Sequence, residues 1–163
     1  MTKSIIVSKA GGPEVLEWKD VEVGDPNENE IKISHTAIGV NFIDTYHRTG
    51  RYPGISFPST IGVEGAGKVL KVGKNITNFS EGDRVCYPLS LGSYCEERLI
   101  NENILIKIPE NVTDDQAAAG LTKGITVHHL FNVARKIEKD DWLLFHAAAG
   151  GVGLIACQWA KAK

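Results

Sequence analysis

The chain has 163 residues, of which 42% are hydrophobic and 23% charged, and its formal net charge at pH 7 is −2. This composition is ordinary for a globular protein of one domain, or of one domain and part of another. The sequence contains no lysine- or arginine-rich run typical of nucleic-acid binding, and no apolar stretch long enough to span a membrane. Three cysteines without C-x-x-C spacing favour reduced thiols, so we expect a cytoplasmic protein without nucleic-acid or membrane partners.

The first 110 residues show short strand-type runs separated by glycine and proline. We expect a short helix over residues 42–48, closed by Gly50, and then a proline-containing loop. Glycines within a strand pattern indicate bulges or a close backbone approach, as where a small barrel bends. The pattern therefore favours an antiparallel, barrel-like domain. The expected strands lie around residues 5–7, 15–23, 31–40, 62–73, 84–85, 94–100 and 104–108.

The pattern changes after Pro109. Thr113 and Gln116 have the spacing of a capping box, with Thr113 as the N-cap of a helix. Helical periodicity then continues to about Arg135, with a break expected near residues 120–124. We therefore expect a β domain over residues 1–110, and linking helices with the start of an α/β domain over residues 111–163.

Residues 142–160 have the form of a strand, a turn of small residues and a helix. Ala148, Gly150 and Gly153 occupy the three glycine positions of G-x-G-x-x-G, the motif of a dinucleotide-binding unit. In such a unit the N–H groups at the helix N-terminus bind the pyrophosphate. The alternative is a plain tight turn between a strand and a helix.

Much of a nucleotide-binding domain would follow this motif. The residue that reads the ribose 2′ position is expected about 20 residues later, whereas only ten residues follow Gly153. One strand and one helix cannot form a sheet, so we expect a barrel followed by a mobile or self-associating tail. Within that tail the apolar side chains expected to lack partners are Leu143, Phe145, Ile155 and Trp159.

Four motifs in order resemble the quinone oxidoreductases of the medium-chain dehydrogenase/reductase superfamily: residues 11–16, 39–44, 82–85 and 147–153. The likeness covers the whole chain, which corresponds to about the first half of such an enzyme. It implies a mainly β, GroES-like, partly open barrel, followed by the first βα unit of a Rossmann domain, with NADPH between the two domains. It also implies hydride transfer from NADPH to quinones or related α,β-unsaturated carbonyls, by enzymes that are homodimers at full length.

Zinc-dependent alcohol dehydrogenases share this fold, and their metal-ligand positions are occupied here by Asn41, Val63 and Thr122. Catalytic zinc requires three nitrogen, sulfur or oxygen ligands, which valine cannot supply. His128 and His129 are adjacent on an expected helix and point apart, so they do not form a chelating pair. We therefore expect no zinc.

The resemblance implies which residues form the site. Asn41 is expected to face the nicotinamide and substrate, with Tyr46 and Tyr52 as further hydrogen-bond donors. The alternatives are an asparagine tolerated at a strand-to-helix junction for Asn41, a core aromatic for Tyr46 and a lid residue for Tyr52. Glu64 and Asp44 are expected to be structural. The residues expected to bind the cofactor are Phe42, Tyr46, Lys123, Thr126, Ala149, Gly150, Gly151, Val152 and Gly153.

The sequence thus favours a zinc-independent, NADPH-dependent quinone oxidoreductase, of which this chain is an amino-terminal fragment. By itself we expect the fragment to turn over nothing and to bind NADPH only weakly. Two alternatives stay open. One is a non-catalytic β-barrel module or split-gene remnant that acts only with a partner chain, and the other is a reductase that resembles alcohol dehydrogenase.

Overall fold

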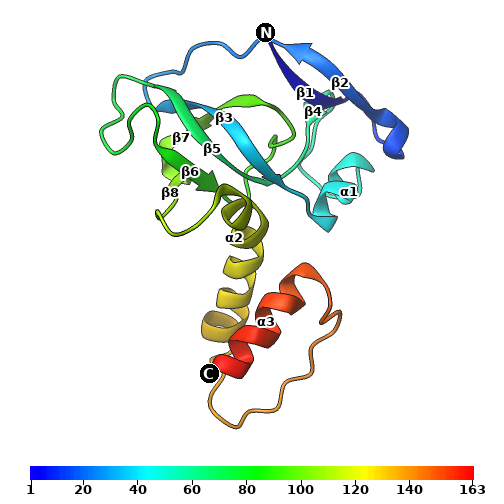
Figure 1. The fold of residues 1–163 in the computed structure, drawn as a ribbon. Coiled ribbons are helices and arrows are strands. Elements are labelled where there is room, and N and C mark those ends of the chain that lie inside the picture. The colour runs from blue at the N-terminus through cyan, green and yellow to red at the C-terminus, as the bar shows by residue number, and fades with distance from the viewer. The chain divides into compact units, whose positions relative to one another are not determined.

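The computed structural model describes residues 1–163 as two compact units, Met1–Ala119 and Gly120–Lys163 (Figure 1). The division falls inside α2 (Asp114–His128). The assignment of residues 1–110 to a catalytic domain and of residues 111–163 to the start of a nucleotide-binding domain stays a prediction.

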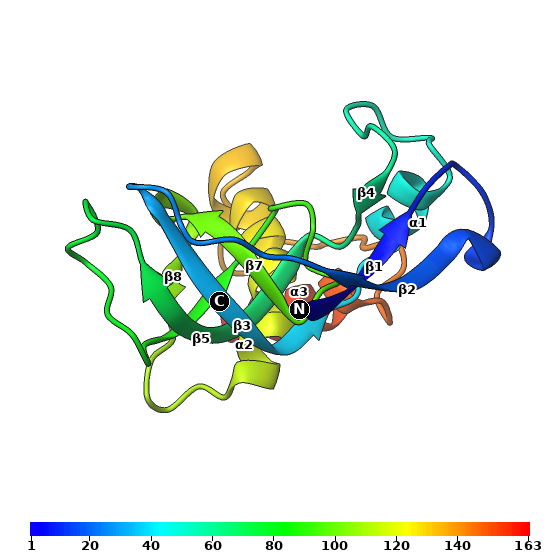
Figure 2. The same ribbon diagram turned by 90° about the horizontal axis from the view of Figure 1, so that it is seen from above.

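The first unit consists of two antiparallel sheets, which can be followed separately in Figure 2. The smaller sheet has the order β2-β1-β4, and the larger has the order β7-β3-β5-β6-β8. This arrangement of short antiparallel strands confirms the pattern seen in the sequence. The strands are β1 (Thr2–Val7), β2 (Leu16–Val21), β3 (Glu30–Gly39), β4 (Ser59–Thr60), β5 (Glu64–Val72), β6 (Arg84–Tyr87), β7 (Glu97–Asn101) and β8 (Ile106–Lys107).

Three short helices connect these strands. A 3₁₀ turn, Pro13–Val15, comes before β2, where the sequence predicted an earlier start of the strand. A second 3₁₀ turn, Glu102–Ile104, separates β7 from β8. The predicted short helix is confirmed as α1 (Phe42–Arg48), and Gly50 after it has a φ of +69°, which favours glycine.

The long strands β3 and β5 pair with two irregularities of register, one between His35 and Ala37. Here a Cβ atom on Gly67 would lie 2.1 Å from the carbonyl oxygen of Ser34, so only glycine allows the two backbones to approach this closely. This contact gives the physical reason for the glycine-rich sequence of β5. The core of the larger sheet consists of Ile31, Ile33, Val69, Ile76, Val85, Tyr87, Ile100 and Leu105.

A partly buried polar network joins side chains of β3, β6 and β7. His35 Nδ1 donates to the carbonyl oxygen of Cys95 at 2.7 Å, while the Tyr87 hydroxyl donates to His35 Nε2 at 2.7 Å. Arg98 donates to the Tyr87 hydroxyl at 3.3 Å, and its guanidinium lies 5.1 Å from the centre of the Tyr87 ring. Burial, helped by the positive charge of Arg98, lowers the pKa of His35 to about 4. The imidazole is therefore neutral at physiological pH.

The second unit contains the rest of α2, a π-helical turn over His129–Ala134, and α3 (Gly151–Ala162). The capping box at the start of α2, which belongs to the first unit, is confirmed. The Gln116 N–H donates to the Thr113 hydroxyl oxygen at 3.2 Å, and the Thr113 N–H donates to Gln116 Oε1 at 3.0 Å. The expected break near residues 120–124 is wrong, because α2 continues through both glycines and changes its helical type only at His129. None of the helices is both long and apolar enough to cross a bilayer.

The strand expected from Trp142 does not form. A strand needs hydrogen-bonded neighbours, and this unit contains no other strand, so residues 142–145 are irregular. The expectation that Leu143, Phe145, Ile155 and Trp159 lack partners is also wrong in part. Phe145, Ile155 and Trp159 pack on a cluster formed by Val127, Phe131, Ile137 and Ala156. Leu143 lies outside this cluster and is exposed, as are Trp142 and Leu144.

Candidate functional site

Asn41 lies at the junction between β3 and α1, and three contacts fix its position. Its backbone N–H donates to Asp44 Oδ2 at 2.8 Å, which is the carboxylate half of a capping box. Its side-chain Nδ2 donates to Glu64 Oε1 at 2.7 Å. The register of β3 with β5 pairs Gly39 with Glu64, so the sheet itself places this completely buried glutamate beside the start of α1. The Asn41 side chain also accepts the backbone N–H of Asp44, which is the other half of the capping box, so both ends of the amide are held within the first unit.

Gly39 gives a steric reason for this arrangement. A Cβ atom at this position would lie 2.4 Å from Glu64 Cγ and 2.3 Å from the carbonyl oxygen of Ala118. Any larger residue would displace the Glu64 side chain that binds Asn41. Gly39 therefore leaves the space in which the Glu64 side chain binds Asn41.

Asp44 is the second anchor of α1. Its side chain is only 3% exposed, and Oδ2 accepts a hydrogen bond of 2.8 Å from the Tyr94 hydroxyl in addition to the one from Asn41. Burial raises the pKa of Asp44, and the two donated hydrogen bonds oppose the rise. Burial and the hydrogen bond to Asp44 hold the pKa of Tyr94 well above its usual range. The expected structural role of Asp44 thus has a geometric basis, with Tyr94 as a partner that the sequence did not indicate.

Three aromatic residues lie on the exposed side of α1 and the loop after it. The rings of Phe42 and Tyr46 meet edge to face, with centroids 5.4 Å apart. The Tyr52 N–H donates to the carbonyl oxygen of Tyr46 at 3.4 Å, and the Tyr52 ring lies edge to face on buried His47 with centroids 5.3 Å apart. All three predicted residues are solvent-accessible, so they are not core aromatics. The structure brings them together with Asn41 in one segment.

The second group of predicted residues lies in the second unit, where a tight turn leads into α3. Gly150 is the N-cap of α3, and its N–H donates to the carbonyl oxygen of Ala147 at 2.8 Å. A Cβ atom on Gly153 would lie 2.5 Å from the Cα and carbonyl oxygen of Ala148. The third glycine of the motif is thus required for close packing of helix and turn, as the sequence predicted.

The remaining predicted cofactor residues lie near this turn or on α2. A Cβ atom on Gly151 would lie 3.0 Å from Cδ and Cε of Lys123, so the lysine stem lies against the start of α3. Val152 packs against the apolar cluster, and Ala149 is exposed in the turn. The Thr126 hydroxyl donates to the carbonyl oxygen of Thr122 at 2.8 Å. A helix N-terminus with glycines and a nearby lysine fits the pyrophosphate of a dinucleotide.

The positions compared with the zinc ligands of alcohol dehydrogenases hold Asn41, Val63 and Thr122. No group of three or more histidine, cysteine, aspartate and glutamate side chains is arranged to hold a metal ion. Val63 is a buried apolar residue, and the amide nitrogen of Asn41 is bound to Glu64. Cys86 and Cys95 are buried as free thiols, and burial raises the pKa of each.

Comparison with known proteins identifies the family. Residues 27–129, more than half of the chain, match the alcohol dehydrogenase GroES-like domain. The chain belongs to this family. It is 47% identical to the quinone oxidoreductase of Pseudomonas aeruginosa, with 99% of this chain and 50% of the relative covered. A 2-haloacrylate reductase from Burkholderia is 42% identical, with the same shares covered.

The solved structures agree with this assignment. The crystal structure of Escherichia coli quinone oxidoreductase complexed with NADPH is 48% identical and superposes with a TM-score of 0.95, covering 98% of this chain and 49% of that one. The predicted fold class is thus confirmed: a GroES-like, partly open barrel followed by the start of a Rossmann domain. The chain spans about half the length of the relatives that it matches.

Proposed function

We propose that this chain is the amino-terminal half of an NADPH-dependent reductase of quinones or related α,β-unsaturated carbonyls, which works without zinc. The relatives support the reaction class, since they include quinone oxidoreductases and a reductase of 2-haloacrylate. The NADPH in the Escherichia coli structure supports the choice of cofactor.

The anchored start of α1 is the observation that carries the proposal. The contact between Asn41 and Glu64 fixes the amide, and the capping contact with Asp44 fixes the backbone at the same point. Tyr46 and Tyr52 present exposed rings on the same segment. The hydroxyl groups of Tyr46 and Tyr52 can donate hydrogen bonds to a substrate, and donors aimed at a carbonyl oxygen stabilise the negative charge that develops on it during reduction.

The site residues of this chain would have different roles in the proposed reaction. Bound NADPH supplies the hydride, and the substrate carbonyl oxygen accepts hydrogen bonds from the tyrosine hydroxyls. Asn41, held by Glu64, positions the ring of the nicotinamide and the substrate. The start of α3, with Gly150, Gly151 and Gly153, would bind the pyrophosphate, and Lys123 would add a positive charge beside it.

Metal content and chelator sensitivity test this proposal. The protein would be completed by fusing residues 1–163 to the carboxyl-terminal half of the Escherichia coli quinone oxidoreductase. We expect the purified fusion to contain no stoichiometric zinc by elemental analysis, and to oxidise NADPH only when a quinone is present, at a rate that a chelator does not change. One zinc per chain, or loss of activity with chelator, would overturn the zinc-free mechanism. A folded fusion without quinone-dependent NADPH oxidation would overturn the activity.

A further inference from the structure

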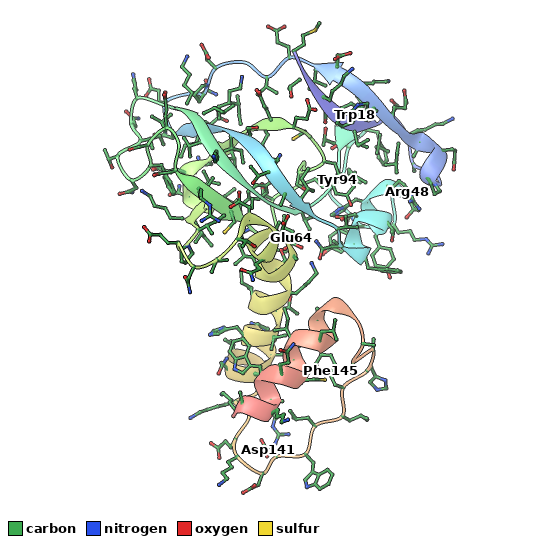
Figure 3. All side chains as sticks on the ribbon, in the orientation of Figure 1. Trp18, Arg48, Glu64, Tyr94, Asp141 and Phe145 are labelled. Carbon is green, nitrogen blue, oxygen red and sulfur yellow. The ribbon has the colours of Figure 1, made fainter.

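α1 has only seven residues, which is too few for a helix to be stable by itself, so contacts at its two ends determine its position. Asn41 and Asp44 fix the first end through their hydrogen bonds to the rest of the first unit. Figure 3 labels Glu64, which binds Asn41 at that end, and Arg48, which is the last residue of α1. The contacts of Arg48 therefore decide how the second end is held.

The last turn of α1 has carbonyl groups that find no partner within the helix. Those of Tyr46 and His47 accept N–H groups from residues 50–52, which follow the helix directly. The carbonyl oxygen of Arg48 instead accepts the Gly11 N–H at 3.2 Å, from 37 positions earlier in the chain. The Arg48 side chain returns this bond, because its Nε donates to the carbonyl oxygen of Gly11 at 3.2 Å. These two hydrogen bonds are here called the Gly11–Arg48 contact.

The segment that binds Arg48 is itself fixed by its sequence. The Glu14 carboxylate accepts the Gly12 N–H at 2.8 Å, which closes the turn. Val15 is buried in an apolar cluster with side chains from β1 and from the loop after α1. A Cβ atom on Gly11 would lie 2.4 Å from Cγ1 of Val15, so the turn meets its buried anchor closely at this glycine. The motif of residues 11–16 therefore provides a fixed partner for the end of α1.

The position of Tyr52 depends on the end of α1 in two ways. Its N–H donates to the carbonyl oxygen of Tyr46 at 3.4 Å, and its ring lies edge to face on buried His47 with centroids 5.3 Å apart. Both partners belong to the last turn of α1, and Gly50, with its φ of +69°, reverses the chain between them and Tyr52. A shift of the end of α1 would therefore move the Tyr52 hydroxyl.

We propose that Arg48 is a positioning residue of the reductase site. Through the Gly11–Arg48 contact it fixes the end of α1, and so holds the Tyr52 hydroxyl in place for the substrate. Arg48 acts through Tyr52 and not by contact with the substrate. This inference rests on the proposed function, because it is there that Tyr52 donates to the substrate carbonyl. It also gives the motif of residues 11–16 a role in the site, which it supports from outside.

Two variants of similar size separate the donated hydrogen bond from packing and charge. Glutamine carries its side-chain nitrogen as many bonds from Cα as the Nε of arginine, so Arg48→Gln can still donate to the carbonyl oxygen of Gly11. Methionine has a methyl group at that position, so Arg48→Met cannot. Both variants lose the positive charge, and a difference between them therefore reports the hydrogen bond alone.

Hydrogen exchange of the 163-residue chain tests the Gly11–Arg48 contact without any assay of activity. We expect the amides of residues 50–52 to exchange at least about fivefold faster in Arg48→Met, and within about twofold of the unchanged chain in Arg48→Gln. The amides of β3 are the internal reference and should exchange equally in all three proteins. Equal exchange of residues 50–52 in the two variants would overturn the contact. Faster exchange of β3 in Arg48→Met would also overturn it, since it would show a general loss of stability.

The kinetics of the protein fused to the Escherichia coli carboxyl-terminal half test the role of Arg48 in the site. We expect Arg48→Met to lower kcat/KM for the quinone at least about fivefold, with the KM for NADPH changed by less than about twofold. Arg48→Gln should restore kcat/KM to within about twofold of the unchanged fusion. Because Arg48 acts through Tyr52, adding Arg48→Met to Tyr52→Phe should lower kcat/KM by less than about twofold further.

The results distinguish the failure of this inference from the failure of the proposed function. Multiplied losses in the double variant, or a loss seen only in the KM for NADPH, would overturn the positioning role of Arg48. A folded fusion without quinone-dependent NADPH oxidation would overturn the proposed function, and with it that role. The exchange measurement decides the Gly11–Arg48 contact in either case, because it needs no turnover.

Discussion

The Tyr94 hydroxyl donates a 2.8 Å hydrogen bond to the buried Oδ2 of Asp44, which lies 50 positions earlier in the chain. This bond ties α1, which carries the proposed site, to the loop before β7. The same carboxylate oxygen accepts the N–H of Asn41, so the position of the first site residue depends on a contact between distant parts of the first unit.

We predict that Tyr94→Phe lowers the free energy of unfolding by about 1–3 kcal/mol, because it removes a donor from a buried carboxylate. Tyr46→Phe serves as the matched control, since the Tyr46 side chain is exposed, and we expect a change below about 0.5 kcal/mol. Urea unfolding followed by circular dichroism measures both. Equal stability of the two variants would show that the bond to Asp44 does not support the fold.

The His35 network predicts a loss of stability in mild acid. Burial lowers the pKa of His35 to about 4 in the folded protein, whereas in the unfolded chain it has its ordinary value of 6.5. As the pH falls, His35 therefore binds a proton in the unfolded chain before it does so in the folded protein. The contribution of neutral His35 to the free energy of unfolding is fully present above pH 6.5 and is lost as the pH falls towards 4. The size of this loss is at most about 3 kcal/mol.

The variant His35→Gln isolates this effect, because glutamine has no titrating group in this range. Urea midpoints measured between pH 6.5 and pH 4 should fall less steeply for the variant than for the unchanged chain. If both slopes were the same, His35 would not be the group that titrates on unfolding.

Much of the first unit could be predicted from the sequence, because its signals are local. Alternating residues, glycine and proline punctuation, and the bounds of α1 all appear within short windows of the chain. The hydrogen-bond partners could not be predicted in the same way. Tyr94 has no motif around it, and its contact with Asp44 exists only because the segment before β7 crosses between the two sheets. The link from Asn41 to Glu64 likewise depends on the register of two long strands.

The second unit shows where a correct motif gave a wrong local structure. The glycine pattern predicted the turn and α3, and the packing of Gly153 on Ala148 agrees with it. The run of apolar residues from Trp142 predicted a strand, but strand formation depends on neighbours that a local pattern does not contain. The apolar side chains of α3 instead pack on the end of α2 and the turn after it.

The contact between Gly153 and Ala148 predicts a clear steric effect. In Gly153→Ala the new Cβ atom would lie 2.5 Å from backbone atoms that cannot move aside easily, so we expect α3 to be destabilised by about 1–3 kcal/mol. Gly120→Ala is the control, because a Cβ atom there meets nothing within 4 Å and alanine favours a helix interior by about 0.5–1 kcal/mol. Hydrogen exchange of the α3 amides should become faster in the first variant only.

The anchoring of Asn41 predicts the kinetics of the protein fused to the Escherichia coli carboxyl-terminal half. Removal of one hydrogen bond to the reacting groups should raise the barrier by about 1–3 kcal/mol, so Asn41→Ala and Tyr46→Phe should each lower kcat/KM by roughly 5- to 100-fold. Asn75 provides a matched control, because its amide also donates to a glutamate, Glu28, but far along the chain from α1. Asn75→Ala should leave kcat/KM unchanged, and equal rates for all three variants would assign Asn41 and Tyr46 a purely structural role.

The fate of a transferred hydride tests the central claim most directly, since it separates reduction of a conjugated double bond from reduction of a carbonyl group. The fusion protein would be incubated with NADPH carrying deuterium at both C4 positions and with 3-buten-2-one, in the presence and absence of a chelator. We predict a saturated ketone with one deuterium on its β-carbon, formed at the same rate in both conditions. Deuterium on the carbonyl carbon of an alcohol, or product formation that requires a metal, would contradict the account and indicate chemistry of the alcohol dehydrogenase type.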